Sequence, residues 1–115
     1  MPDDCLFCRI VAKQVPAKIV RENERIVAFE DLHPQAPSHV LLIPREHIVS
    51  ALEIGPATRA LAGELIELAG AIARERGFAD DGYRLVFNTN RAAGQSVDHI
   101  HLHLLGGRRF GWPPG

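Results

Sequence analysis

The chain of 115 residues is poor in aromatic residues and cysteine, and it contains no long apolar segment and no cluster of basic residues. Its apolar runs, such as residues 40–43, are far shorter than the roughly 20 residues that span a bilayer. The net charge is −1, so the electrostatic footprint of a nucleic-acid-binding protein is missing. The acidic residues 1–4 lack the basic-then-apolar layout of a secretory signal. We therefore expect a cytoplasmic protein that binds neither a membrane nor nucleic acid.

The length fits a single domain, and the periodicity of apolar residues predicts its elements. Leu61, Leu65, Leu68 and Ile72 recur at helical spacing, which predicts a long helix over residues 56–76. The other predicted elements are a short helix at residues 6–13 and strands at residues 18–22, 25–31, 39–44, 83–88 and 97–105. The strand at residues 39–44 is almost entirely apolar, so we expect it to be central. Together these elements predict an α+β fold: a mostly antiparallel sheet of about five strands with one long and one short helix.

The last predicted strand contains a histidine at every second position: His99, His101 and His103. Because successive side chains of a strand point to opposite faces, the three imidazoles are expected to line one face. A solvated strand face that happens to be rich in histidine is one interpretation. Zinc binding by the row itself is a second. In the third, one imidazole is a nucleophile and its neighbours orient groups or transfer protons.

The residues around the row favour the nucleophile. Gly94, Gln95 and Ser96 directly precede it, and Asn88 ends the neighbouring predicted strand. Glycine lets backbone N–H groups approach an anion, while the serine hydroxyl and the asparagine amide add neutral donors. Such a collection of donors suits a phosphate group.

With these segments in view, the sequence resembles the histidine triad (HIT) family, and within it the HINT branch of nucleoside phosphoramidate hydrolases. The resemblance covers nearly the whole chain and implies a single HIT domain over residues 1–115. It also implies a homodimer in which two sheets join into one, and a purine nucleoside monophosphate site at each histidine row. The segments that carry it are residues 6–10, 26–31, 34–39, 43–44 and 94–105 and the closing residues 106–115, which are the most specific to the branch.

The resemblance also assigns roles to single residues. It implies that His101 is the nucleophile, and the further catalytic candidates are His103, Ser96 and His39. We expect His39 to be hydrogen-bonded into the row, although a role as a metal ligand is the alternative. The expected substrate-binding residues are Phe7, Ile10, Phe29, Asp31, Leu32, Asn88, Gly94, Gln95, Ser96, Val97, His103 and Trp112, the last reaching the partner subunit's site. His33 and Asp98 depart from what is frequent in the branch.

Two cysteines, Cys5 and Cys8, form a C-x-x-C pair, which in a reducing compartment indicates a metal site or a redox pair. Some prokaryotic members of the family combine such a pair with two histidines as a zinc site. The matching residues here are His47 and His99, and a site with four protein ligands would be structural. Two free cysteines and a thiol–disulfide switch are the alternatives.

The expected function is hydrolysis of purine nucleoside 5′-phosphoramidates at the α-phosphorus through a nucleotidyl-histidine intermediate, with no cofactor needed for the chemistry. Hydrolysis of dinucleoside polyphosphates is the first alternative. The second is a nucleotide-binding dimer with vestigial catalysis, and the third is a zinc hydrolase that uses the row as ligands.

Overall fold

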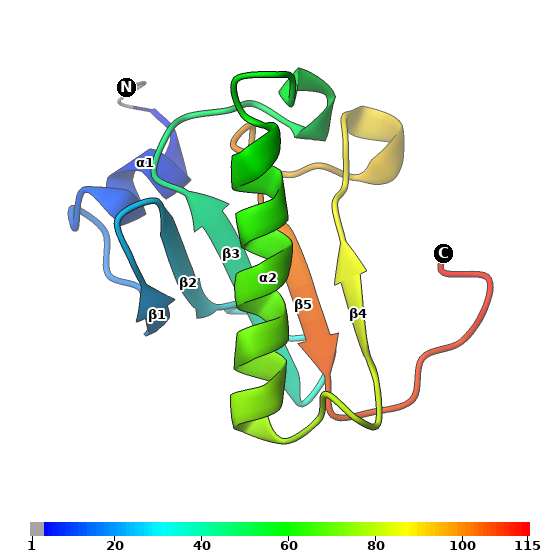
Figure 1. Cartoon of the computed structure of the whole chain (residues 1–115). Helices are drawn as coiled ribbons and strands as arrows, with labels where there is room; N and C mark the ends of the chain where they lie inside the picture. Colours follow the sequence, from blue (N-terminus) through cyan, green and yellow to red (C-terminus); the bar gives the residue numbers. More distant parts are fainter. Residues whose placement is uncertain (1–3) are drawn as a thin grey trace.

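The computed structural model describes residues 4–115, so the acidic residues 1–3, on which the expected lack of a secretory signal rests in part, lie outside the described residues. The elements are α1 (Leu6–Val11), β1 (Ile19–Glu22), β2 (Ile26–Glu30), β3 (Ser38–Pro44), η1 (Ala51–Glu53), α2 (Arg59–Arg76), β4 (Tyr83–Val86), η2 (Arg91–Ala93) and β5 (Leu102–Gly106). The predicted α+β composition, with one long and one short helix, is confirmed (Figure 1). Within the described part of the chain, no helix combines the length and apolarity needed to cross a membrane.

The five strands form one sheet in the order β1-β2-β3-β5-β4, with every neighbouring pair antiparallel. β3 is central and buried along its whole length, as its apolar sequence predicts. The β1–β2 hairpin turns at Asn23, whose side-chain oxygen accepts hydrogen bonds from the N–H groups of Arg25 and Ile26, both at 2.9 Å. An asparagine is suited to this turn because its side chain satisfies the free backbone donors.

Different helices pack on the two faces of the sheet. α2 packs across one face, where Leu61, Leu65 and Ile72 join the main core (Figure 1). α1 covers part of the other face through Phe7 and Ile10. The histidines lie on this second face, whose cover is least complete at β4, where all residues are only half-buried.

α2 is three residues shorter at its start than predicted. Residues 56–58 form a turn instead, and the Thr58 hydroxyl oxygen accepts the N–H of Gly55 at 3.0 Å. At the other end the prediction is correct, because Gly77 follows the last residue with a φ of 83°. This left-handed conformation is one that glycine adopts without steric cost.

The last strand differs most from its prediction, since β5 begins at Leu102 instead of residue 97. The pairing of Leu42 with Leu102 would place Pro44 opposite Ile100, but proline has no N–H to donate. The Pro44 carbonyl is also engaged, because it accepts a hydrogen bond from His99. The Ile100 N–H turns to the Ile48 carbonyl at 2.6 Å instead, which ends the pairing with β3.

Candidate active site

The side chains of the histidine row still alternate with the core residues, although only His103 belongs to a paired strand. Ile100 and Leu102 enter the core under α2. On the opposite face, the Phe7 ring packs edge-on against the rings of His99 and His101, with centroids 5.9 and 5.0 Å apart. The predicted spacing therefore places the imidazoles on one face, even where the strand is not hydrogen-bonded.

The hydrogen bond of His101 fixes which of its nitrogens is free. Its Nδ1 lies 2.8 Å from the carbonyl oxygen of His99. A carbonyl oxygen only accepts hydrogen bonds, so Nδ1 carries the proton and Nε2 carries the lone pair. Burial also lowers the pKa of His101, which keeps the ring neutral near pH 7. His101 therefore offers an unprotonated Nε2, as a nucleophile requires.

A second chain of contacts fixes the protonation of His103. His39 Nδ1 accepts the backbone N–H of Gln35 at 3.0 Å, so in the neutral ring Nε2 carries the proton. This Nε2–H faces His103 Nδ1 at 2.9 Å, and it also lies 3.4 Å from a carboxylate oxygen of Asp31. Burial lowers the pKa of His39, and it lowers the pKa of His103 to about 4, so both rings are neutral.

The consequence is a free donor in the middle of the site. With Nδ1 of His103 acting as the acceptor, Nε2 of that ring carries the proton. In the described part of the chain, this nitrogen is the one buried side-chain nitrogen or oxygen atom that has no hydrogen-bond partner. An unpaired buried donor is costly, so it indicates a place for a ligand's acceptor atom.

A hollow of about 240 Å³ opens beside these histidines, between α1, β2 and the segment before β5. It contains most of the residues expected to hold a nucleoside: Phe7, Ile10, Phe29, Asp31, Leu32, Ser96 and Val97. Its walls are mainly apolar, and the Leu32 side chain stands at its edge with 89% of its surface exposed. Pro16, Ala17 and Lys18 also line the hollow, and no sequence motif marked them as site residues.

His33 lies at the same hollow, where Asp31 holds its backbone. The Asp31 Oδ1 atom accepts the N–H of His33 at 2.8 Å, while Oδ2 faces His39. Asp31 is therefore more than a turn residue after β2, because it touches both the hollow and the histidine relay.

Asn88 is half-buried just beyond β4, whose Val86 pairs with His103.

The loop before the row has an unusual backbone. Gly94 has a φ of 80°, which favours glycine, and Asn90 has a φ of 65°. Among the described residues, none accepts a backbone hydrogen bond from Ser96 or Val97. These N–H groups are free donors close to the row, as the anion-binding prediction requires. The Gln95 amide differs, because backbone groups occupy both of its N–H donors and bind its oxygen.

The expected metal ligands come together although they lie far apart in the sequence. The ligand atoms of Cys5, Cys8, His47 and His99 all lie within 4.8 Å of one another. Four of the six separations lie between 3.2 Å, for Cys8 Sγ and His47 Nδ1, and 3.5 Å, for Cys8 Sγ and His99 Nδ1. Zinc bonds of about 2.0–2.3 Å in a tetrahedron give edges of about 3.3–3.8 Å, so the four residues fit zinc.

The chemistry of the four donors agrees with this fit. His99 Nε2 donates to the Pro44 carbonyl at 2.8 Å, so its Nδ1 carries a lone pair that faces the thiols. Burial raises the pKa of the Cys8 thiol to about 11, with Cys5 adding to the effect. A bound cation would counteract this rise in the pKa, because it binds the thiolate form, as zinc does.

The second histidine cluster fits a hydrogen-bond relay better than a metal. Asp31, His39 and His103 also lie within 4.8 Å of one another, but the 2.9 Å between the two histidine nitrogens is a hydrogen-bond distance. His39 is thus bonded into the row, as expected. Among the described residues, no group that could hold a metal contains His101.

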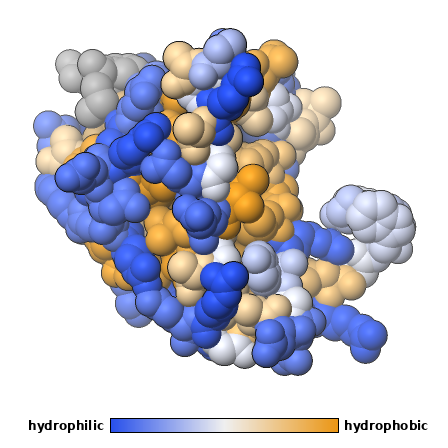
Figure 2. Space-filling model, in the orientation of Figure 1, coloured by the Kyte–Doolittle hydropathy of each residue, from blue (hydrophilic) through white to orange (hydrophobic). Residues whose placement is uncertain are grey.

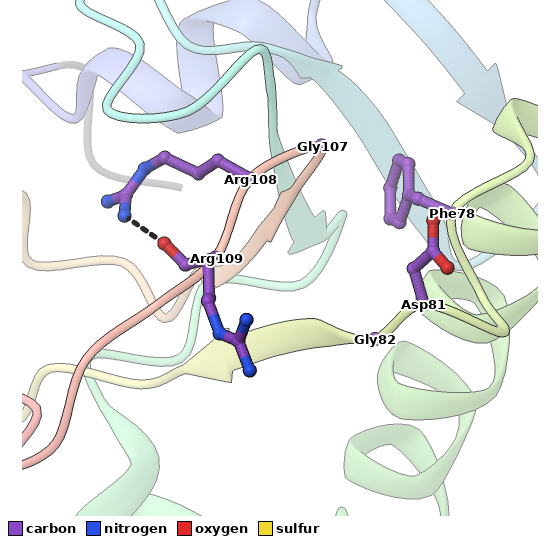
Figure 3. A pocket seen from close by; sticks show the side chains of 6 residues that line it. All are labelled: Phe78, Asp81, Gly82, Gly107, Arg108 and Arg109. Carbon is purple, nitrogen blue, oxygen red and sulfur yellow. Dashed lines mark hydrogen bonds between the residues drawn. The ribbon is translucent and has the colours of Figure 1, made fainter.

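A larger hollow of about 480 Å³ lies at another end of the sheet, around Phe78, Asp81 and Arg109 (Figure 3). None of the predicted site residues lines it. Trp112 belongs to the C-terminal segment, which extends away from the body of the protein (Figures 1 and 2), and 84% of its surface is exposed. In the structure, Trp112 therefore contributes nothing to the hollow of its own chain.

The chain belongs to the histidine triad family, because the HIT domain family matches residues 12–110. The purine nucleoside phosphoramidase of Escherichia coli K12 is 42% identical over 111 residues, which cover 96% of this chain and 93% of that protein. A HIT family hydrolase from Legionella pneumophila is 46% identical with a TM-score of 0.95, covering 97% of this chain and 100% of that one. A histidine triad protein from Clostridium difficile is 34% identical with a TM-score of 0.93, over 96% of both chains. The protein is thus a relative of nucleotide hydrolases.

Proposed function

We propose that the protein, as one HIT domain over residues 1–115, hydrolyses the P–N bond of purine nucleoside 5′-phosphoramidates. The observation that carries this proposal is the pair of complementary imidazoles, His101 with a free lone pair and His103 with a free N–H. The relative from Escherichia coli is named for activity on compounds of this class. A nucleophile beside an unpaired donor is the arrangement that attack on a phosphoryl group needs.

In the first step, His101 Nε2 attacks the α-phosphorus, and the bond from phosphorus to the leaving amine breaks in line. The product is a nucleotidyl-histidine, and the amine takes a proton from Ser96 or a neighbouring imidazole. In the second step, water attacks the phosphorus and returns a proton to the group that protonated the amine, while the P–N bond to His101 breaks and nucleoside monophosphate leaves. The His99 carbonyl holds the Nδ1 proton in both steps, which stabilises the positive charge that forms on the ring.

The phosphoryl oxygens need donors as their negative charge grows. The His103 Nε2–H, the N–H groups of Ser96 and Val97 and the amide of Asn88 are the groups that would supply them. Such fixed donors stabilise the transition state because they are aligned before the reaction begins. Gly94 contributes the left-handed turn that brings this backbone next to the row.

The nucleoside would occupy the apolar hollow. Phe7, Ile10, Phe29 and Leu32 would enclose the base and the ribose, and Asp31 would accept hydrogen bonds from the ribose hydroxyls. The walls offer few polar groups that could distinguish one purine base from another, so recognition of the base would rest mainly on apolar contact.

The Cys5, Cys8, His47 and His99 centre would hold zinc and leave it no open position, so that the ion stabilises the fold instead of taking part in the reaction.

We also propose a homodimer that joins two sheets through β4, the edge strand next to the C-terminal segment. Arg84 of β4 donates to the Gly111 carbonyl at 2.8 Å and lies over the Phe110 ring. These contacts hold the start of the C-terminal segment, which would reach a partner's site in the proposed dimer. The cytoplasmic location stays a prediction.

The test uses adenosine 5′-phosphoramidate with a fluorescent amine as the leaving group. The native protein should release the amine, the H101A variant should lose this activity, and the native protein should keep most of it after treatment with a chelator. Binding of AMP by the variant would show that it is folded. If the native protein bound AMP but released no amine, the phosphoramidate proposal would fail, and release from a dinucleoside polyphosphate would support that alternative. Complete loss of activity when the chelator removes the metal would favour a zinc hydrolase.

A further inference from the structure

The side chain of Gln95 connects three backbone segments through hydrogen bonds. Its Oε1 atom accepts the N–H of Asn90 at 2.8 Å. Its Nε2 atom donates to the carbonyls of Val49 at 2.7 Å and Val97 at 3.1 Å. A glutamine amide has two N–H donors, so both are in use and none is left for a substrate.

The contact with Asn90 closes the loop around η2. The Gln95 N–H donates to the Asn90 carbonyl at 3.1 Å, while the Gln95 side chain accepts the Asn90 N–H. Asn90 adopts a φ of 65°, a left-handed conformation that costs free energy for a residue other than glycine. This pair of bonds supplies the constraint that holds Asn90 in place.

The contact with Val49 ties the same loop to a rigid part of the fold. Residue 47 belongs to the Cys/His centre, and the Ile48 carbonyl accepts the N–H of Ile100 between the two histidines His99 and His101. Val49 is the next residue, so Gln95 is fastened to a segment that already bonds to the histidine row. The third contact, to Val97, fixes the end of the loop that carries the free N–H groups.

We propose that Gln95 is a positioning residue, which acts through the backbone of residues 96–97 and does not touch the substrate. Its three bonds hold the N–H groups of Ser96 and Val97 at a fixed distance from His101. The inference rests on the proposed function, since it takes these N–H groups as the donors to the phosphoryl oxygens. A shift of about 1 Å in such groups can cost on the order of 100-fold in rate.

The test compares Q95M with Q14M. Methionine has a similar length and no amide, so Q95M removes all three bonds at small cost in volume. Gln14 is exposed and its side chain makes no hydrogen bond to the described residues, so Q14M is the matched control. Amide exchange is measured by NMR on the ligand-free protein, together with the affinities for adenosine and AMP and the rate of phosphoramidate hydrolysis.

In Q95M, the Asn90 amide should exchange at least about tenfold faster, because its acceptor is gone. AMP affinity should fall at least about tenfold and the rate by about 10- to 100-fold, while adenosine binds within about twofold of the native protein. Q14M should match the native protein throughout. Unchanged exchange at Asn90 with a reduced rate would overturn the proposal, because it would indicate direct contact with the substrate. So would an equal loss of adenosine affinity, which would indicate general unfolding. Failure of the proposed function is a different result, namely a native protein that hydrolyses no phosphoramidate.

Discussion

His39 should control the reaction without touching the substrate, because it determines which nitrogen of His103 carries the proton. The H39L variant removes the Nε2–H that faces His103 Nδ1 at 2.9 Å. The His103 ring is then free to adopt the other tautomer, with the proton on Nδ1. In that form Nε2 presents a lone pair to the phosphoryl oxygen, and repulsion replaces a hydrogen bond.

The size of the effect follows from the bond that is lost. A hydrogen bond to a charged acceptor contributes about 1.5–3 kcal/mol, and 1.4 kcal/mol corresponds to a factor of ten in rate. We therefore expect kcat/KM of H39L to fall about 10- to 150-fold, with adenosine binding as the control for folding. His101 is unaffected by this relay, since its tautomer depends on the His99 carbonyl.

The assay is a double-mutant cycle with H103L. If His39 acts through His103, the double variant is no slower than H103L alone, because the relay has nothing left to orient. Nitrogen NMR shifts should in addition show the His103 proton on Nε2 in the native protein and a mixture of the two neutral tautomers in H39L. Rate losses that multiply in the double variant, or an unchanged His103 tautomer, would refute the reasoning.

Three further predictions concern pH, metal and packing. Burial lowers the pKa of His101 below its ordinary value of 6.5, so the neutral nucleophile persists to lower pH. The fall of kcat/KM toward acid pH should therefore have its midpoint below pH 6.5, and a midpoint at or above 6.5 contradicts this. The C8S variant should unfold at a lower temperature than the native protein and lose the stabilisation by added zinc, and an unchanged response to zinc would exclude the four-ligand site. A Cβ at Gly106 would overlap the Phe78 ring, so G106A should lower the free energy of unfolding by about 1–3 kcal/mol. G63A, in open space on α2, should raise it by about 0.5–1 kcal/mol, and similar changes in both variants would contradict the packing argument.

The parts of the fold that the sequence predicts well are those set by local periodicity. The apolar residues of β3 and the helical spacing of Leu61, Leu65 and Ile72 reflect burial on known faces, so they appear in the sequence directly. The alternation of histidines likewise predicts that they share a face. The family resemblance, carried mainly by residues 94–115, then supplies an interpretation of the chemistry.

Long-range hydrogen bonds explain what the sequence does not predict. β5 starts late because Pro44 lacks an N–H and Ile100 bonds to Ile48, a contact that no periodicity contains. The direction of the Gln95 amide is also hidden, because its acceptor on Val49 lies 46 residues away in the sequence. A polar residue beside a predicted phosphate site suggests a substrate contact, and only the structure shows that its amide is already in use.

The three histidines of one row differ in their partners, and these differences are enough to give them different chemistry. The carbonyl of Pro44 turns the lone pair of His99 toward the cysteines, the carbonyl of His99 leaves the Nε2 lone pair of His101 free, and His39 gives His103 a free donor. His99 therefore belongs to two sites, with its ring in the Cys/His centre and its carbonyl on the nucleophile. A metal that fixes the His99 ring would also fix the peptide group that orients His101. Because the His99 carbonyl holds the His101 Nδ1 proton even without an ion, removal of the metal should lower the rate only modestly, with most of the activity and the adenosine affinity kept.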